Sequence, residues 1–406
     1  MSLTIPGRRV LALADDLSGA AETAVALRTP AHLLLGPLSD PVPPPADGEA
    51  TVVDLDSRHL PADAAAHAVR SVTGRAAEDV VLFKKVDSLL RGNLAAEAAA
   101  YAEGGAGVVI ATALPVTGRT VRDGVVHLKG AALHTTDAWR AEPGPAPESV
   151  AAALGDLPVS PVPLSAVRGP LLNELRARFT QGRHPVCDAE TDADLDAIAR
   201  AALQLGPGVR LLGTGGLAGA VGRVLGDRAV PRPGPEAGHG SPRPLLVVVG
   251  TAEPSAAAQA AHLVADGAHH LPLTADDLLR ARRPLALPAT GVTVVRIAGL
   301  LAPSSARRLS AALAEAVAET SYDGDLVLTG GETARRVLDA LGITRLRPVG
   351  QIHHGAVHSR TPDGRSVVTR PGSFGESDSL LRIARALRRS GHVRPVPPHH
   401  PTGVTS

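Results

Sequence analysis

The stretch VVLFKKVDSLLRGNLAAEAAA, residues 80–100, joins a short apolar run to a run rich in alanine and leucine. The apolar run at 80–83 has the length of a buried β-strand, and the residues after Asn93 are typical of a helix. Chemically distinct side chains stand between the two, namely Lys84, Lys85, Asp87, Ser88, Arg91, Gly92 and Asn93. A strand that delivers such residues into a helix start is typical of a βα unit, and parallel sheets bind ligands at the carboxyl ends of their strands.

Similar units recur along the whole chain. Strands are predicted at 10–14, 51–55, 80–83, 108–112, 185–188 and 209–213, and then at 245–250, 292–297 and 325–329. Alanine- and leucine-rich segments separate them, so the pattern predicts an α/β protein with two domains. Each domain is expected to hold a mostly parallel sheet flanked by helices, with the active site in the cleft between the domains. Residues 122–124 predict a hairpin, and Lys129 beyond it is expected at the surface.

A proline- and glycine-rich segment divides the chain. The 406 residues are enough for two or three domains, and DRAVPRPGPEAGHGSPRP at 227–244 has no apolar period. We therefore predict an N-terminal domain at 1–228, a linker at 229–244 and a C-terminal domain at 245–390. The tail at 391–406 is predicted to be disordered.

Composition excludes several classes of protein. The formal net charge is +1 and there are only six aromatic residues, which argues against a nucleic-acid binder. Cys187 is the single cysteine, so neither an internal disulfide nor a Cys₂His₂ or Cys₄ zinc site can form. The start of the chain lacks a signal-peptide pattern and no window resembles a membrane span, so a cytoplasmic protein without membrane attachment is expected.

Lysine is rare in this chain. Only Lys84, Lys85 and Lys129 occur among 41 basic residues, a bias in which lysine is replaced by arginine wherever the two are interchangeable. Two of the three stand in the opening stretch, which favours a chemical role there. Lys85 could neutralise phosphate, Arg91 could grip a carboxylate, and Asp87 could accept a hydroxyl proton. The alternative is a solvated helix start with an aspartate cap.

Two further strand ends carry acids. Asp15 and Asp16 follow the first strand and precede a Ser18-Gly19 turn, and Asp54, Asp56, Ser57 and Arg58 follow the second. Adjacent carboxylates at a sheet edge repel each other unless a ligand or a base offsets them, although a helix N-cap would explain an aspartate there as well. Arginine beside aspartate fits a small polyhydroxy acid.

The second half has three turns of small residues. Residues 250–256, 330–333 and 372–375 each follow an apolar run or precede a helix, a geometry that presents backbone N–H groups to an anion. The turns match neither the Walker A nor the Rossmann glycine pattern. Together they suggest a nucleotide site, and their alternative reading is helix packing that requires small residues.

The motifs ADDLSGAAE, DLDSR, KKVDSLLRGN, ALPVTGRT, GTAEPS, TGGETA and RPGSFG stand in one order over residues 8–389. In this the chain resembles the four-carbon acid sugar kinases, a family of two-domain proteins. The resemblance implies transfer of the ATP γ-phosphoryl group, with Mg²⁺, to the terminal hydroxyl of threonate, erythronate or 3-oxo-tetronate. It also implies that the N-terminal domain binds the sugar acid and the C-terminal domain binds the nucleotide.

The resemblance places functional residues by motif. Sugar-acid contacts are expected from Asp15, Asp16, Arg58, Lys85, Val86, Asp87 and Ser88, with Arg91 added for its charge. Nucleotide contacts are expected from Thr251, Ser255, Gly330, Gly331, Glu332, Thr333, Gly372 and Gly375. In the catalytic hypothesis Asp16 or Asp87 deprotonates the hydroxyl, Arg58 or Arg91 holds the carboxylate, and Lys85 with Mg²⁺ offsets phosphate charge.

The chain departs from the family pattern at several positions. Glu253 adds negative charge to the first nucleotide turn, and Arg370 stands where lysine is usual. The alternatives left open are a sensor without catalysis, a kinase for another small hydroxy acid, and an oxidoreductase that uses the turn at 250–256. Metal-ligating residues and stereochemistry are not specified by the sequence, and the oligomeric state is left open, with a homodimer as one expectation.

Overall fold

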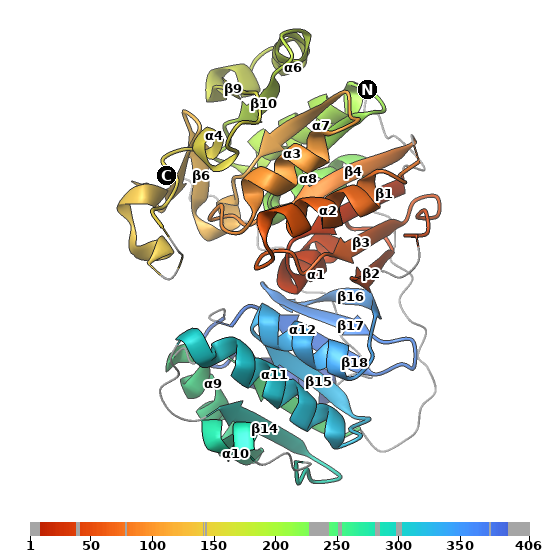
Figure 1. The fold of residues 1–406 in the computed structure, drawn as a ribbon, viewed down its shortest axis with the longest axis vertical. Coiled ribbons are helices and arrows are strands. Elements are labelled where there is room, and N and C mark those ends of the chain that lie inside the picture. Colours follow the sequence, from red (N-terminus) through yellow and green to blue (C-terminus); the bar gives the residue numbers. More distant parts are fainter. Residues whose placement is uncertain are drawn as a thin grey trace, which may run out of the picture.

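The computed structural model describes residues 9–37, 41–77, 79–140, 142, 144–226, 243–250, 254–280, 285–297, 303–372 and 375–388. Figure 1 shows two layered α/β halves, one above the other, which meet where α1 and β2 of the first half face β16 and α12 of the second. The predicted linker at 229–244, apart from its last two residues, and the predicted disordered tail lie outside the described residues.

The first half is built on parallel strands. In spatial order they are β2 (Ala31–Leu35), β3 (Ala50–Asp54), β1 (Arg9–Ala14), β4 (Val80–Lys85), β11 (Val209–Gly213), β5 (Gly107–Ala111), β10 (His184–Cys187) and β9 (Val159–Val162). One face carries α2 (Ala62–Thr73) and α3 (Leu94–Ala102), which pack together. The other carries α1 (Leu17–Ala26), α8 (Gly215–Leu225) and α7 (Asp192–Gln204).

Shorter elements complete this half. They are α4 (Val150–Ala153), α5 (Leu164–Val167) and α6 (Leu171–Thr180), with a small antiparallel sheet of β6 (Arg119–Arg122), β7 (Val125–Leu128) and β8 (Ala131–Ala132). The β6–β7 turn confirms the predicted hairpin, and Lys129 is exposed as expected.

The second half also has a parallel core. Its strands run in the order β13 (His269–Leu273), β14 (Val292–Ile297), β12 (Leu245–Val249), β15 (Asp325–Thr329) and β18 (Ser366–Arg370), followed by the antiparallel β17 (Ala356–Arg360) and β16 (Arg345–His353). Its helices are α9 (Pro254–Ala265), α10 (Ala275–Arg280), α11 (Pro303–Glu319), α12 (Gly331–Ala340) and α13 (Ser379–Arg388). Helices α10–α12 pack in sequence, and α9 packs on α13.

The two sheets join edge to edge. Arg345 and Leu346 of β16 pair antiparallel with Leu34 and Leu33 of β2, so that fifteen strands of the described chain form one continuous sheet. The predicted mostly parallel α/β architecture is confirmed, whereas this junction was not anticipated. An antiparallel pairing between strands more than 300 residues apart leaves no local sequence pattern, since each strand reads only as a short edge strand.

All nine predicted strands form, with shifts of one or two residues at half of their ends, because their runs are largely apolar. Six strands of the main sheet were missed, namely β2, β9, β13, β16, β17 and β18. Several of these contain proline or alternate polar with apolar residues, as HHLPL and RLRPVGQIH do. None of the described helices is both long and apolar enough to cross a membrane.

Candidate active site

The carboxyl ends of three neighbouring strands lie level with one another. In the register of the first sheet Ala14 of β1 is paired with Asp54 of β3 and with Lys85 of β4. The residues that follow these positions therefore share one edge, as is usual for ligand sites in parallel sheets. This register brings together the predicted substrate residues from three separate motifs.

Arg58 links the acidic side chains at this edge. Its Nε lies 2.7 Å from Asp15 Oδ2, and its Nη2 lies 2.9 Å from Asp16 Oδ1 and 3.9 Å from Asp87 Oδ1. Burial alone would raise the pKa of Asp15, but Arg58, Lys84 and Lys85 together hold it below its ordinary value. The adjacent carboxylates are thus neutralised within the protein, which explains how Asp15 and Asp16 can stand side by side.

Asp16 combines a structural contact with partial exposure. Its side chain accepts the N–H of Gly19 at 3.0 Å and so caps α1, as the N-cap alternative requires. It also keeps 20% of its side chain exposed, more than Asp15 or Asp87. The cap and a chemical role are therefore compatible at this residue.

Asp87 is tied to Arg91. Its carboxylate receives Arg91 Nε at 2.7 Å and Nη2 at 2.8 Å, and it also accepts the N–H of Leu89. Burial would raise the pKa of Asp87, but Arg91, Arg58 and Lys85 hold it well below its usual range. A carboxylate so strongly stabilised in its charged form is a weak base, which favours a structural role for the Asp87–Arg91 pair over proton abstraction.

The two adjacent lysines lie on opposite faces of β4, because successive strand residues alternate. Lys84 is completely buried, and its Nζ lies 2.6 Å from Oε2 of Glu97 on α3. Lys85 points the other way, toward α1, where a Cβ added at Gly19 would lie 2.8 Å from its Nζ. No ion pair or side-chain hydrogen bond of Lys85 Nζ occurs within the described residues, so its charge is available to a ligand.

Val86 and Ser88, which belong to the same KKVDSLLRGN motif, lie in different surroundings. Val86 is buried in the apolar core, so its side chain does not reach the edge. Ser88 Oγ accepts a hydrogen bond from Nη1 of Arg119, the first residue of β6. Arg119 was not singled out from the sequence, although it stands inside the ALPVTGRT motif; its charge and its position after the fourth strand were the available signals.

The predicted nucleotide turns follow neighbouring strands of the second sheet. Ser255 is exposed on the first turn of α9, after β12; Gly330 and Gly331 follow β15; Gly372 and Gly375 follow β18. Gly330 has a φ of +88°, and Gly375, with a φ of +93°, accepts a hydrogen bond from Gln259 Nε2. Thr251 and Glu253 lie outside the described residues.

Thr333 and Glu332 lie less favourably for a phosphate. Thr333 is buried, with its Oγ1 3.1 Å from Ser310 Oγ, and a Cβ added at Gly250 would overlap it. This position corresponds to the packing alternative for the turn. Glu332 is directed to Arg307, with 3.6 Å between Oε1 and Nε.

The two halves meet at the acidic edge. A Cβ added at Gly331 would lie 3.3 Å from Asp16 Oδ2 and 3.2 Å from Ser18 Oγ. Close by, Nη1 of Arg335 on α12 lies 2.8 Å from Oδ2 of Asp54, and both side chains are buried. Burial raises the pKa of Asp54 to about 7 against the lowering effect of Arg335. The second glycine turn therefore stands directly against the charged cluster of the first half.

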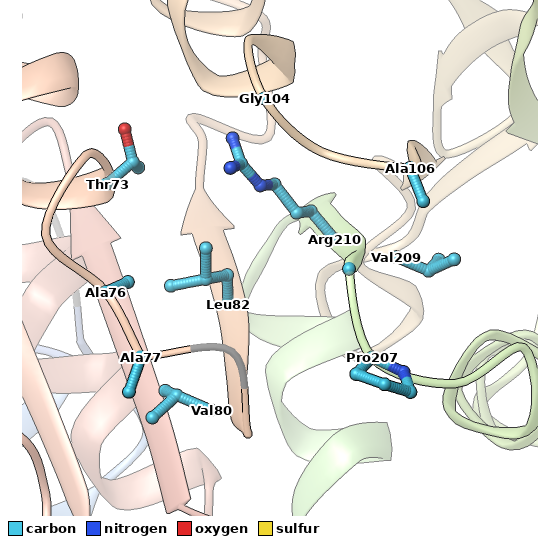
Figure 2. A pocket seen from close by; sticks show the side chains of 11 residues that line it. Thr73, Ala76, Ala77, Val80, Leu82, Gly104, Ala106, Pro207, Val209 and Arg210 are labelled. Atoms are coloured by element: carbon cyan, nitrogen blue, oxygen red, sulfur yellow. The ribbon is translucent and has the colours of Figure 1, made fainter.

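A cavity of about 390 Å³ opens elsewhere. It lies at the amino ends of β4 and β11, between Val80, Leu82, Ala106, Val209 and Arg210 (Figure 2). Nη1 of Arg210 donates there to the carbonyls of Tyr101 and Glu103. The cavity occupies the opposite strand ends and takes no part in the candidate site.

Comparison with known proteins assigns the two halves to a class of two-domain phosphotransferases. Residues 10–221 match the model of a sugar-binding N-terminal domain, and residues 246–380 match that of a nucleotide-binding C-terminal domain. The chain belongs to the four-carbon acid sugar kinase family. It is a kinase, a phosphotransferase with an alcohol group as acceptor, and not the oxidoreductase left open by the sequence.

Curated relatives carry this assignment. The chain is 34% identical to a D-threonate kinase of Cupriavidus necator over 94% of this chain and 98% of that protein. It is 35% identical to a D-threonate kinase of Bordetella bronchiseptica, covering 93% and 96% of the two chains. A D-threonate kinase of Salmonella typhimurium is 30% identical, covering 92% and 96%.

Solved structures support the fold. A protein of Salmonella typhimurium LT2 superposes with a TM-score of 0.74 at 20% identity, over 93% of this chain and 99% of that one. A Haemophilus influenzae protein gives a TM-score of 0.68 at 19% identity, over 92% and 98%. At this identity the likeness concerns the fold alone.

Proposed function

We propose that this kinase transfers the γ-phosphoryl group of ATP to the terminal hydroxyl of a four-carbon sugar acid of the threonate type. One observation carries the proposal: Gly331, in a glycine turn of the nucleotide-binding half, lies against Asp16 in the charged cluster of the sugar-binding half. The names of the curated relatives make D-threonate the first substrate to test.

In this proposal Asp16 is the base. Among Asp15, Asp16 and Asp87 it is the most exposed carboxylate, and it lies against the glycine turn of the second half, so it can accept the hydroxyl proton as the phosphoryl group arrives. Arg58 holds Asp15, Asp16 and Asp87 in place. Lys85 offsets negative charge on the transferred group, since its Nζ lies beside the same α1 turn as Asp16.

The glycine turns supply the nucleotide contacts. Ser255, Gly331, Gly372 and Gly375 follow three adjacent strands, so their backbone N–H groups can face one polyphosphate, while Gly330, whose N–H donates to the carbonyl of Arg370, shapes its turn. The buried Thr333 would act through packing. Thr251 remains a proposed contact outside the described residues.

Mg²⁺ is expected to accompany ATP. Within the described residues no group of three or more acidic, histidine or cysteine side chains could hold a metal by itself. Magnesium in kinases is usually held by substrate phosphates and one or two carboxylates. When bound, the ion would neutralise phosphate charge.

The test is ADP release across a panel of D-threonate, L-threonate, erythronates and 3-oxo-tetronates, with ATP and Mg²⁺. We expect turnover with at least one of them, and ³¹P NMR of the product should show a phosphate ester on the terminal carbon. Stabilisation against heat by an acid without any turnover would instead support the sensor alternative. Turnover only with other small hydroxy acids would support a different kinase specificity.

We further propose domain limits at 228 and 245, a cytoplasmic location, the absence of a nucleic-acid partner and a homodimer. Sedimentation of the full chain tests the last of these directly.

A further inference from the structure

Four cationic side chains gather at the edge proposed to bind the sugar acid, but they differ in what they already contact. They are Arg58, Lys85, Arg91 and Arg119. A four-carbon sugar acid brings one carboxylate to such a site, and a guanidinium that is already paired with protein carboxylates has less to offer it. The partners of each cation therefore decide which one the carboxylate can use.

Arg58 and Arg91 are occupied. Arg58 lies within 3 Å of both Asp15 and Asp16, by Nε and Nη2 respectively. Arg91 makes a two-pronged contact with Asp87 and lies 3.8 Å from Glu142. Binding a substrate carboxylate at either arginine would place it next to a protein carboxylate and would weaken an existing pair.

Arg119 differs from both. Its guanidinium donates to the hydroxyl of Ser88, and it forms no ion pair with any carboxylate of the described residues. It is half-buried, and burial lowers its pKa while Asp87 and Glu22 favour the charged form and Arg91 opposes it. Its bond to Ser88, the residue that follows Asp87, places the guanidinium beside the cluster.

The backbone fixes Arg119 at this edge. Its N–H and C=O both pair with Leu114, which stands three residues beyond the end of β5. The tight turn of residues 114–119 thus returns the chain to the carboxyl edge of the sheet. Since β5 neighbours β11 and β11 neighbours β4, the turn lies on the same side of β1 as the Lys85–Ser88 segment.

We infer that Arg119, supported by Ser88, binds the carboxylate of the acid substrate and determines the preference for acids over neutral polyols. This rests on the proposed function. Lys85, beside Gly19 and Asp16, then serves the opposite end of the substrate, where the phosphoryl group is transferred. The substrate would lie with its carboxylate toward β6 and its terminal hydroxyl toward α12.

The test compares an acid with its neutral analogue. We would measure kcat and KM for D-threonate and for D-threonamide with wild-type protein, Arg119→Met and Arg119→Lys. A charged hydrogen-bonding contact of ordinary strength predicts a loss of about 10- to 100-fold in kcat/KM for threonate in Arg119→Met, mostly through KM. The value for threonamide should stay within a factor of about three, and Arg119→Lys should lie between.

The matched control is Arg122→Met. Arg122 lies on the same strand, is 59% exposed and pairs with Glu190, so its loss should leave both substrates unaffected. An unchanged ratio of threonate to threonamide in Arg119→Met overturns the inference. If that variant does not fold, as judged by its melting temperature, the same ratio in Arg119→Lys decides.

Binding separates this inference from the proposed function. Heat-stabilisation by threonate without nucleotide should occur in the wild type and be reduced in Arg119→Met, whether or not turnover is seen. Absence of turnover with every acid would reject the proposed function alone. Equal stabilisation of the wild type and Arg119→Met by threonate would reject the role of Arg119 alone.

Discussion

The carboxyl edges of the two sheets meet between the halves, and they differ in the kind of residue that forms them. The edge of the first half carries charged side chains held by one another, with Arg58 in contact with Asp15 and Asp16. The edge of the second half carries turns in which the backbone is exposed by the lack of side chains, as at Gly330 and Gly375. One edge is suited to hold a polar substrate by specific groups, and the other to hold phosphates by N–H groups.

This difference predicts which substitutions impair each edge. A charged cluster is sensitive to removal of a single charge, because its partners are left uncompensated in a buried place. A glycine edge is sensitive to the addition of a single methyl group, because the added Cβ restricts the backbone or fills the space that a ligand needs. Substitutions of the two kinds should therefore separate turnover, stability and nucleotide affinity.

The largest effect is expected from Asp16→Asn. Loss of the proposed base should lower kcat by about 10²- to 10⁴-fold, with ADP affinity unchanged because the second half is intact. Steady-state kinetics and calorimetry with ADP measure the two quantities. Asp47→Asn, at an exposed position paired with Arg9, is the control. Normal turnover in Asp16→Asn would remove this residue from the chemistry.

Lys84 and Lys85 allow the effect of losing a structural charge to be compared with the effect of losing a functional one. Lys84→Met leaves Glu97 charged and buried, and should destabilise the protein by about 3–5 kcal/mol. Lys85→Met removes a charge that helps to keep Asp15 and Asp87 ionised but forms no ion pair within the described residues, so it should cost less stability than Lys84→Met while lowering kcat by about 10²- to 10³-fold. Urea unfolding and kinetics separate them, with Lys129→Met as an exposed control. Equal stability losses in the first two variants would contradict the assignment of opposite faces.

Gly330→Ala tests the glycine edge. An L-residue at a φ of +88° is strained, and nothing lies within 4 Å of the added Cβ, so the change acts through the backbone alone. We expect a loss of stability of about 1–3 kcal/mol and weaker ADP binding, while stabilisation by the acid substrate persists.

Gly291→Ala is a matched control for that variant. Gly291 also has a φ of +88° and open space around it, but it precedes β14 at the amino edge of the sheet. The same strain should therefore lower stability without affecting ADP binding. Indistinguishable ADP affinities of the two variants would argue against a nucleotide contact at the turn that Gly330 shapes.

The smallest effect concerns pH. Burial raises the pKa of Asp54 to about 7, so the folded state binds a proton at a pH where the unfolded state does not. The stability from this group is complete below about pH 4 and is lost as the pH rises through about 7. Asp54→Asn should flatten this part of the stability profile, measured by urea unfolding from pH 4 to 8. Parallel profiles of the two proteins would refute it.

The sequence predicted the first edge better than the second. Chemically specific residues at strand ends, such as Asp16, Arg58 and Lys85, can be recognised without knowing the fold, and the structure does bring them together. The role of Thr333 was harder to assign, because a small polar residue after a glycine pair fits both a phosphate contact and a packing contact. Only its burial against Gly250 and Ser310 distinguishes the two.

Some features had little or no local signal in the sequence. The sequence does not indicate that Lys84 has a structural role and that the charge of Lys85 is available to a ligand. This difference arises because α3 lies over one face of β4 and α1 over the other. For Arg119 the sequence offers only its charge and its place in the ALPVTGRT motif, and the turn after β5 is what places it beside Ser88. Arg335 and Asp54 are 281 positions apart, and their pairing follows from how the halves meet.

The sequence by itself determined the parallel α/β architecture, the two halves and the motifs of a sugar-acid kinase, because apolar periodicity and strand-end chemistry are local properties. The tertiary structure decided which charges compensate one another, which lysine remains available and where the two sheets join. These depend on distances between residues far apart in the chain, and the energy of a charge depends on what surrounds it rather than on its neighbours in sequence.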